Sequence, residues 1–133
     1  MMAGELVRMG WLPDNVISSD SQRTRETWEN MASMFGRSIS VCFYRQLYLA
    51  GLDAFQTHVE GESDEVETLL VLGHNPGWED VVESLTGQPI QMTTANAVLM
   101  HKFSANWTSA VHSPEVWQVE AILRPREPRT TAR

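Results

Sequence analysis

The sequence contains a single cysteine, Cys42, among 133 residues, so no disulfide can form within the chain. A lone cysteine is typical of a reducing compartment and favours an intracellular protein. No apolar run approaches the roughly 20 residues of a membrane span, and the first residues lack the apolar segment of a secretory signal peptide. Internal repeats are also absent. These absences exclude a disulfide-stapled scaffold and give no reason to expect a membrane partner.

Basic residues are fewer than acidic ones. The chain has 10 Lys and Arg and 17 Asp and Glu, which gives a net charge of −7 at pH 7. Surfaces that bind nucleic acid are normally basic, so a nucleic-acid partner is not expected. A small anionic substrate would need a local basic pocket set into an acidic surface. The histidines are too scattered for a zinc signature, and no metal is expected.

The chain is long enough for one domain with a real core, since 42% of its residues are apolar and 20% are charged. We place this domain at residues 1–125. Residues 126–133 are expected to form a flexible tail, because the last ten positions hold two prolines and four arginines.

A short apolar run and a polar turn occupy residues 69–77, which read Leu-Leu-Val-Leu-Gly-His-Asn-Pro-Gly. The run at 69–72 is typical of a strand buried on both faces in a parallel sheet. Asn75 can cap a helix and proline suits a first helical position, so a helix is expected over 78–86. His74 would then lie between a strand and a helix, at the sheet edge where ligands bind and a helix N-terminus favours anions.

A helical pattern covers residues 20–35. One stripe of this helix is apolar or small and is expected to pack on a sheet: Thr24, Trp28, Met31, Ala32 and Phe35. Arg23 lies beside the stripe near the helix start and follows a predicted strand, so it is expected at the same sheet edge as His74. Arg25 is expected to face water and to pair with Glu29 one turn later.

Strands alternate with helices in the first two thirds of the chain, and strands dominate near the end. The fold class is therefore α/β, with three layers, a mostly parallel sheet, helices on both faces and an antiparallel edge. Cys42 is expected to be a small core residue. The predicted strands are 15–19, 39–43, 69–72, 95–103 and 116–123, and the predicted helices are 1–9, 20–35, 52–59 and 78–86.

Two segments carry a family resemblance: Ser-Ser-Asp-Ser-Gln-Arg-Thr-Arg-Glu-Thr at 18–27 and Gly-His-Asn-Pro-Gly at 73–77. They resemble signature segments of the histidine phosphatase superfamily, which is phosphoglycerate mutase-like, and most closely its SixA-type phosphohistidine phosphatase branch. Further agreement comes from Leu-Tyr at 47–48, Thr-Thr-Ala-Asn-Ala at 93–97 and Leu-Arg-Pro at 123–125. Gly-Trp-Leu-Pro at 10–13 and Asp20 resemble the corresponding residues of plant and algal members of that branch. The resemblance covers residues 3–125.

One family feature is missing, because the sequence contains no Arg-His-Gly. Proteins of this superfamily begin with a strand that ends in this motif, whose histidine is the nucleophile. The helix at 1–9 looks like the helix that follows that strand, so the resemblance implies that the first strand is missing, with roughly 30 residues or more of a βα unit before Met1. A misplaced start codon, a truncated clone and a genuinely shortened protein would each explain this.

The resemblance implies a cofactor-independent, two-step phosphoryl transfer through a phosphohistidine enzyme intermediate. Arg23 would bind two phosphate oxygens through its planar guanidinium, and protonated His74 would hold a third. Ser19 or Thr94 would add a hydroxyl contact, and Asn75 is assigned to the same phosphate-binding set. Without the motifs, Arg23 would be read as a solvated helix residue and His74 as a structural histidine.

Many relatives carry a carboxylic acid after the second strand that protonates an alkoxide leaving group. The corresponding residues 46–51 read Gln-Leu-Tyr-Leu-Ala-Gly, with no carboxylate before Asp53. A leaving imidazole needs such a proton less, because the pKa of histidine is near neutrality, so a phosphohistidine on a protein is favoured over a sugar phosphate. Glu79 is a conceivable substitute acid.

Three functions therefore stay open. The first is a phosphohistidine phosphatase that is inactive as residues 1–133, because the nucleophile is absent. The second is a pseudoenzyme that binds phosphate or phosphoproteins, and the third is a phosphatase for small phosphate esters. We expect a monomer whose partner is a phosphorylated protein or a small phosphorylated substrate. It would lie in the cytoplasm, or in a plastid if a transit peptide precedes Met1.

Overall fold

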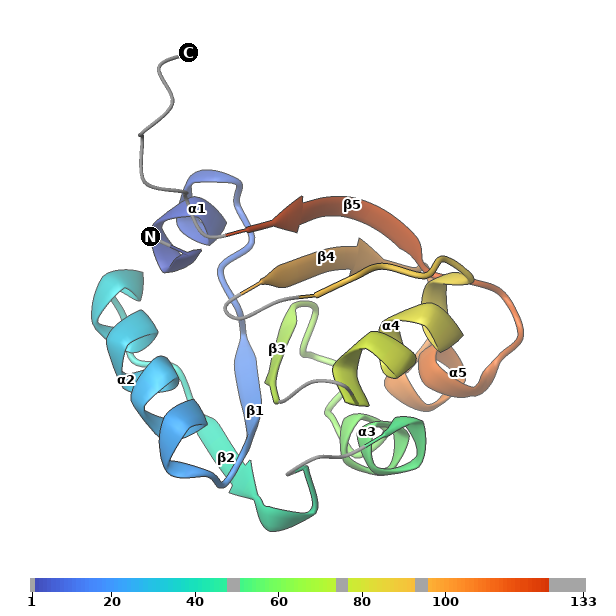
Figure 1. Cartoon of the computed structure of the whole chain (residues 1–133), viewed down its shortest axis with the longest axis horizontal. Helices are drawn as coiled ribbons and strands as arrows, with labels where there is room; N and C mark the ends of the chain where they lie inside the picture. Colours follow the sequence, from blue (N-terminus) through green and yellow to red (C-terminus); the bar gives the residue numbers. More distant parts are fainter. Residues whose placement is uncertain (1, 48–50, 74–76, 93–95, 125–133) are drawn as a thin grey trace.

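A computed structural model describes residues 2–47, 51–73, 77–92 and 96–124 of the chain (Figure 1). Its main sheet has β1 (Asn15–Ser19) in the centre, paired in parallel with β2 (Val41–Tyr44) on one side and β3 (Leu69–Leu72) on the other. The strand order is thus β2-β1-β3. Because all three strands run in one direction, their carboxyl ends meet at one edge of the sheet.

A second sheet consists of β4 (Ala97–His101) and β5 (Gln118–Leu123), which pair antiparallel with an irregularity between Leu99 and Met100. Within the described residues, β3 pairs only with β1 and β4 pairs only with β5. The predicted α/β architecture with an antiparallel edge is confirmed, but the sheet is split between β3 and β4.

Helices cover both faces of the main sheet. The helices α1 (Met2–Arg8) and α2 (Gln22–Phe35) pack on one face. On the other face lie α3 (Leu52–Val59), α4 (Gly77–Thr86) and α5 (Trp107–His112), while a 3-10 turn, η1 (Arg45–Leu47), follows β2. The neighbours Val16 and Ile17 of β1 are both buried and belong to the two different core clusters, as the alternation of side chains along a strand requires.

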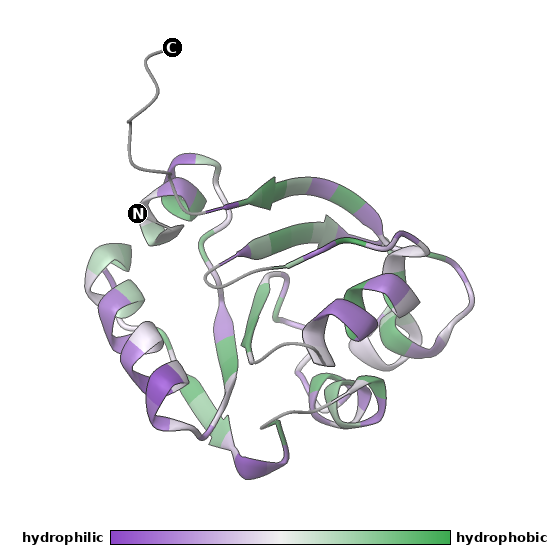
Figure 2. Cartoon of the chain, in the orientation of Figure 1, coloured by the Kyte–Doolittle hydropathy of each residue, from purple (hydrophilic) through white to green (hydrophobic). Residues whose placement is uncertain are grey.

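The helix α2 forms where the sequence pattern predicted it. Ser21 caps its N-terminus by accepting a hydrogen bond from the N–H of Thr24 at 3.3 Å, and Gly36 ends it with φ of 74°. Four of the five residues of the predicted stripe are fully buried: Thr24, Trp28, Met31 and Phe35. The first turns of α2 are mostly hydrophilic (Figure 2).

Some predictions need correction. The second strand is Val41–Tyr44 and not 39–43, and Cys42 is exposed because β2 is an outer strand whose one face is not covered at this position. The strands expected at 95–103 and 116–123 are shorter, and α5 was not predicted. The expected tail at 126–133 lies outside the described residues.

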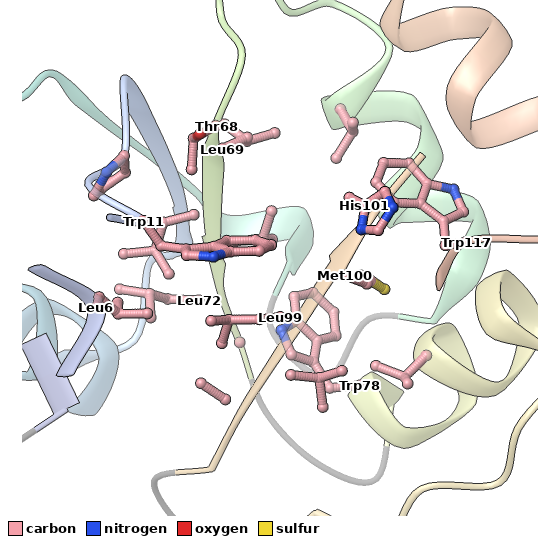
Figure 3. Close-up of a pocket in the computed structure, with 18 of the residues that line it drawn as sticks. Leu6, Trp11, Thr68, Leu69, Leu72, Trp78, Leu99, Met100, His101 and Trp117 are labelled. Atoms are coloured by element: carbon pink, nitrogen blue, oxygen red, sulfur yellow. The ribbon is translucent and has the colours of Figure 1, made fainter. Parts of the chain in front are cut away.

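The strand β3 was expected to be buried on both faces, yet none of its residues is fully buried, although all four are apolar. A cavity of about 2230 Å³ lies beside it, lined by β3 on one side and by β4 on the other (Figure 3). Both strands are hydrophobic over most of their length (Figure 2). The exposure of β3 therefore comes from this cavity and not from a polar surface.

Candidate active site

The candidate site lies at the edge where β1 and β3 end. Ser18 of β1 is opposite Leu72 of β3, so Ser19 and Gly73 are the next residues at that edge. The helix α2 begins here, and Arg23 lies in its first turn. His74 follows Gly73 in the sequence, but His74, Asn75 and Thr94 lie outside the described residues. Their side-chain positions, and the convergence of His74 with Arg23, stay predictions.

Arg23 and Arg25 differ in what they contact. Within the part of the chain that the structure describes, the guanidinium of Arg23 makes no hydrogen bond or ion pair, and the exposed side chain lines the rim of the cavity. Arg25 donates from Nε to Oδ1 of Asp20 at 2.9 Å, and its guanidinium carbon lies 4.0 Å from the ring centroid of Phe43. The predicted pair of Arg25 with Glu29 is therefore wrong. Arg25 is held by a carboxylate, whereas Arg23 has its donors available for an anion.

Ser19 is fully buried and holds the turn between β1 and α2. Its Oγ accepts a hydrogen bond from the N–H of Ser21 at 3.3 Å. Its carbonyl oxygen accepts from the hydroxyls of Ser18 and Thr24, each at 2.8 Å. These bonds fix the start of α2 and thus the point from which Arg23 projects. A direct contact of Ser19 with a phosphate oxygen stays a prediction.

Gly73 has a packing role that sequence reasoning missed. A Cβ atom on Gly73 would lie 2.4 Å from both Cε2 and Cζ2 of Trp78. The ring of Trp78 in turn meets Phe55 edge-on, with 6.1 Å between the ring centroids. Because only glycine leaves room for the indole, this contact fixes where the chain leaves β3 on its way to His74. A glycine between an apolar strand and an aromatic residue five positions later was the available signal.

The carboxylate of Glu79 connects α4 to the segment that leads into residues 93–95. Its Oε2 accepts a hydrogen bond from the backbone N–H of Met92 at 2.6 Å. A role of Glu79 as a proton donor stays a prediction. At the same sheet edge Tyr44 ends β2, and burial raises the pKa of its phenol, with further contributions from Cys42 and Glu62. This phenol is therefore an uncharged neighbour of the site at neutral pH.

The described residues show neither a metal cluster nor a membrane-spanning helix. Among residues 2–47, 51–73, 77–92 and 96–124, no group of three His, Cys, Asp or Glu side chains could hold a metal ion. No helix in those same ranges is both long and apolar enough to cross a membrane.

One curated relative has similar sequence. An uncharacterised chloroplastic protein of Arabidopsis thaliana is 33% identical over 132 residues, which cover 90% of this chain and 60% of that protein. The chain thus spans about 60% of the length of the curated relative that it matches. No protein-family model matches the chain.

Solved structures match nearly the whole chain. A protein assigned as phosphohistidine phosphatase SixA from Nakamurella multipartitia has a TM-score of 0.77 at 18% identity, with 93% of this chain and 78% of that chain covered. A protein with the same assignment from Agrobacterium tumefaciens has a TM-score of 0.74 at 19% identity, with 93% and 75% covered. A protein histidine phosphatase SixA in complex with tungstate has a TM-score of 0.75 at 18% identity, with 92% and 75% covered.

These similarities show the fold, because the chain shares the three-layer α/β architecture of the three solved structures over at least 92% of its length. Two of these structures are assigned as SixA and the third is named SixA, so the fold agrees with the resemblance read from the two motifs. The chloroplastic relative agrees with the plant-like features at residues 10–13.

Proposed function

We propose that the chain forms the oxyanion-binding part of a phosphatase that hydrolyses phosphohistidine on proteins. The observation that carries this proposal is the open guanidinium of Arg23 at the edge where β1 and β3 end. The SixA structure with tungstate supports it, because tungstate is a tetrahedral oxyanion like phosphate. A ligand at the carboxyl ends of parallel strands is also the usual arrangement in open α/β sheets.

Each residue of the site has a defined task in this proposal. The phosphoryl group in transfer carries negative charge on its equatorial oxygens, so catalysis depends on donors that are already in place. Arg23 binds two of these oxygens through its fork, and His74 donates to a third. A nucleophilic histidine forms a bond to phosphorus while the bond from phosphorus to the substrate imidazole breaks. Water then releases phosphate from the enzyme histidine.

The substrate class follows from the leaving group. In residues 46–51 there is no carboxylate, and Leu47, which lies within this stretch, is fully buried. An alkoxide would leave poorly without an acid at this place, whereas an imidazole is a good leaving group near neutral pH. A phosphorylated protein is therefore the proposed partner. The chloroplastic relative supports a plastid location for the protein.

The absence of Arg-His-Gly from the sequence favours a second candidate for residues 1–133 alone, which is phosphate binding without turnover. Arg23 keeps the anion-binding role in both candidates. Residues 1–133 are thus expected to bind an oxyanion and to hydrolyse no phosphohistidine. Release of phosphate from phosphohistidine by the purified chain would contradict this part of the proposal.

Calorimetric titration of residues 1–133 with tungstate tests the binding site. We expect Arg23→Gln to weaken tungstate binding about 10-fold to 100-fold, because hydrogen bonds to charged groups contribute about 1.5–3 kcal/mol. Arg25→Gln is the matched control, since Arg25 lies on the same helix and is already held by Asp20. We expect that variant to bind within about twofold of the unchanged chain.

A third variant, His74→Gln, is expected to weaken tungstate binding, as Arg23→Gln does. Urea unfolding of each variant shows whether any loss of binding comes from a loss of fold. Unchanged tungstate affinity in both Arg23→Gln and His74→Gln would overturn the assignment of the site. Equal losses in Arg23→Gln and Arg25→Gln would point to general surface charge instead.

A further inference from the structure

The segment that follows α4 runs back along that helix. Thr86, at the end of α4, accepts a hydrogen bond from the N–H of Gln88 through Oγ1 at 3.1 Å. Glu79, in the first turn of α4, accepts one from the N–H of Met92 through Oε2 at 2.6 Å. Ile90, between these two contacts, is buried. The segment is thus fixed to α4 at both of its ends and by a buried side chain in the middle.

This segment has little slack. The helix rises by about 10 Å between Glu79 and Thr86, because each helical residue adds about 1.5 Å. The chain from Gln88 to Met92 can span at most about 14 Å, even when it is fully extended. Because these two lengths are close, the contact with Glu79 decides where the end of the segment at Met92 lies.

The chain is also held on the far side of residues 93–95. Asn96 accepts a hydrogen bond through Oδ1 from Nη1 of Arg124, which directly follows β5, at 2.6 Å. The next residue begins β4, which pairs with β5. The stretch that contains Thr94 is therefore fixed on both sides, by α4 before it and by β5 after it.

The Glu79 contact joins the two parts of the sequence that carry predicted oxyanion ligands. Thr94 follows Met92 by two residues, and His74 precedes Glu79 by five. A hydrogen bond to an ionised acceptor is stronger than one to a neutral acceptor, so a carboxylate is a firm holder of a backbone N–H. Because a carboxylate repels an oxyanion, Glu79 is no phosphate ligand itself and affects binding through the chain that it holds.

We propose that Glu79 is a positioning residue of the oxyanion site, which holds Met92 and thereby sets the place of the Thr94 hydroxyl. It acts through the group that it orients, as the hydrogen-bond partners behind metal ligands do. Arg124 supports the same stretch from the other side through Asn96. Because it needs an oxyanion at the edge where β1 and β3 end, this role of Glu79 rests on the proposed function.

Two substitutions of Glu79 separate its charge from its hydrogen bond. Glu79→Gln and Glu79→Ala remove the same negative charge, but only glutamine keeps a side-chain oxygen that can accept from Met92. In calorimetric titration of residues 1–133 with tungstate, we expect Glu79→Ala to bind about threefold to tenfold more weakly than Glu79→Gln. Asp80→Ala is the matched control, since Asp80 is the exposed neighbour on the same helix. We expect that variant to bind within about twofold of the unchanged chain.

Hydrogen exchange at the Met92 amide follows the contact directly. We expect this exchange to be at least about tenfold faster in Glu79→Ala than in the unchanged chain, and within about threefold of it in Glu79→Gln. Urea unfolding of both variants shows whether the fold is kept. Equal stability of the two variants with unequal exchange at Met92 would assign the difference in tungstate binding to this one hydrogen bond.

A double-mutant cycle tests whether Glu79 acts through Thr94. Thr94→Val removes the hydroxyl and should weaken tungstate binding about threefold to tenfold. If Glu79 acts by placing that hydroxyl, Glu79→Ala/Thr94→Val should bind at most about twofold more weakly than the weaker of the two single variants. A residue that only stabilises the fold would give additive losses. Additive losses, or full affinity in Thr94→Val, would therefore overturn the proposal.

Asn96→Ala gives an independent arm if Glu79→Ala does not fold. This variant releases the second hold without a change of charge, and we expect a loss of tungstate affinity of about twofold to threefold, because the bond is exposed. Unchanged exchange at Met92 in Glu79→Ala would overturn the proposal. So would equal affinity of the two Glu79 variants together with unchanged affinity in Asn96→Ala. In these cases Arg23→Gln still weakens binding, whereas unchanged affinity in both Arg23→Gln and His74→Gln would remove the oxyanion site itself.

Discussion

Replacement of Gly73 by alanine would place a methyl group within the space of the Trp78 indole. The added carbon would lie 2.4 Å from Cε2 and Cζ2 and 2.8 Å from Cη2 of that ring. Non-bonded carbon atoms are at their optimal separation at about 3.5–4.0 Å, so the ring has to move by about 1 Å. Phe55 lies edge-on to this ring with 6.1 Å between centroids, and the shift would disturb that contact as well.

The expected loss of stability is that of an overpacked core site, about 1–3 kcal/mol. For a domain of this length, each 1 kcal/mol lowers the melting temperature by about 3–6 °C, so we expect a fall of about 3–18 °C. Calorimetry gives this melting temperature. Because Gly73 directly precedes His74, tungstate affinity should also fall in this variant.

Two other glycines give matched controls. The nearest atom to a Cβ on Gly61 is the carbonyl oxygen of His58 at 3.9 Å, an ordinary contact, so Gly61→Ala should be close to neutral. Nothing lies within 4 Å of a Cβ on Gly4, which lies inside α1, and alanine there should stabilise by about 0.5–1 kcal/mol. The double variant Gly73→Ala/Trp78→Leu should recover part of the loss relative to the sum of the single changes. Equal melting temperatures for Gly73→Ala and Gly61→Ala would refute the reasoning.

Two further predictions concern the supports of the fold. Lys102 donates from Nζ to three oxygens of the segment 110–115 at 3.0, 2.7 and 2.8 Å, so Lys102→Met should lower the free energy of unfolding in urea by about 1–3 kcal/mol. A loss no larger than that of Arg8→Met, whose ion pair is exposed, would show that these bonds contribute little. Asp14 accepts the N–H groups of Glu67 and Thr68 through Oδ2, both at 2.9 Å. Asp14→Ala should therefore speed hydrogen exchange at those two amides, and retained protection would argue against this clamp.

The sequence predicted those elements whose signals are local. The helix α2 has a serine cap, an apolar stripe and a terminal glycine within one stretch, and all of these act as expected. The helix α5 has no such stripe and is rich in residues with low helix propensity. It is held by the Asn106 cap and by a hydrogen bond from Trp107 Nε1 to the carbonyl of Val66 at 2.9 Å. A contact between residues so far apart in sequence cannot be read from a local pattern.

The partners of the arginines in the candidate site also could not be read from a local sequence pattern. Spacing along the helix suggested Glu29 as the partner of Arg25, because residues four apart are neighbours on a helix surface. The actual partners are Asp20, which precedes the helix, and Phe43 on the neighbouring strand β2. The family motif selected Arg23 without this knowledge, and the geometry adds a reason for the choice, since Arg25 is already engaged. Whether a strand is an outer one also depends on topology, which is why Cys42 was misplaced in the core.

The cavity and the candidate site are connected through β3. One edge of this strand is paired with β1, its other edge lines the cavity, and its carboxyl end leads through Gly73 into the segment that carries His74. Trp78 lies against Gly73 and also lines the cavity, so the same ring takes part in both regions. A substitution of Trp78 is therefore expected to change both the lining of the cavity and the packing of Gly73, which directly precedes His74 in the sequence.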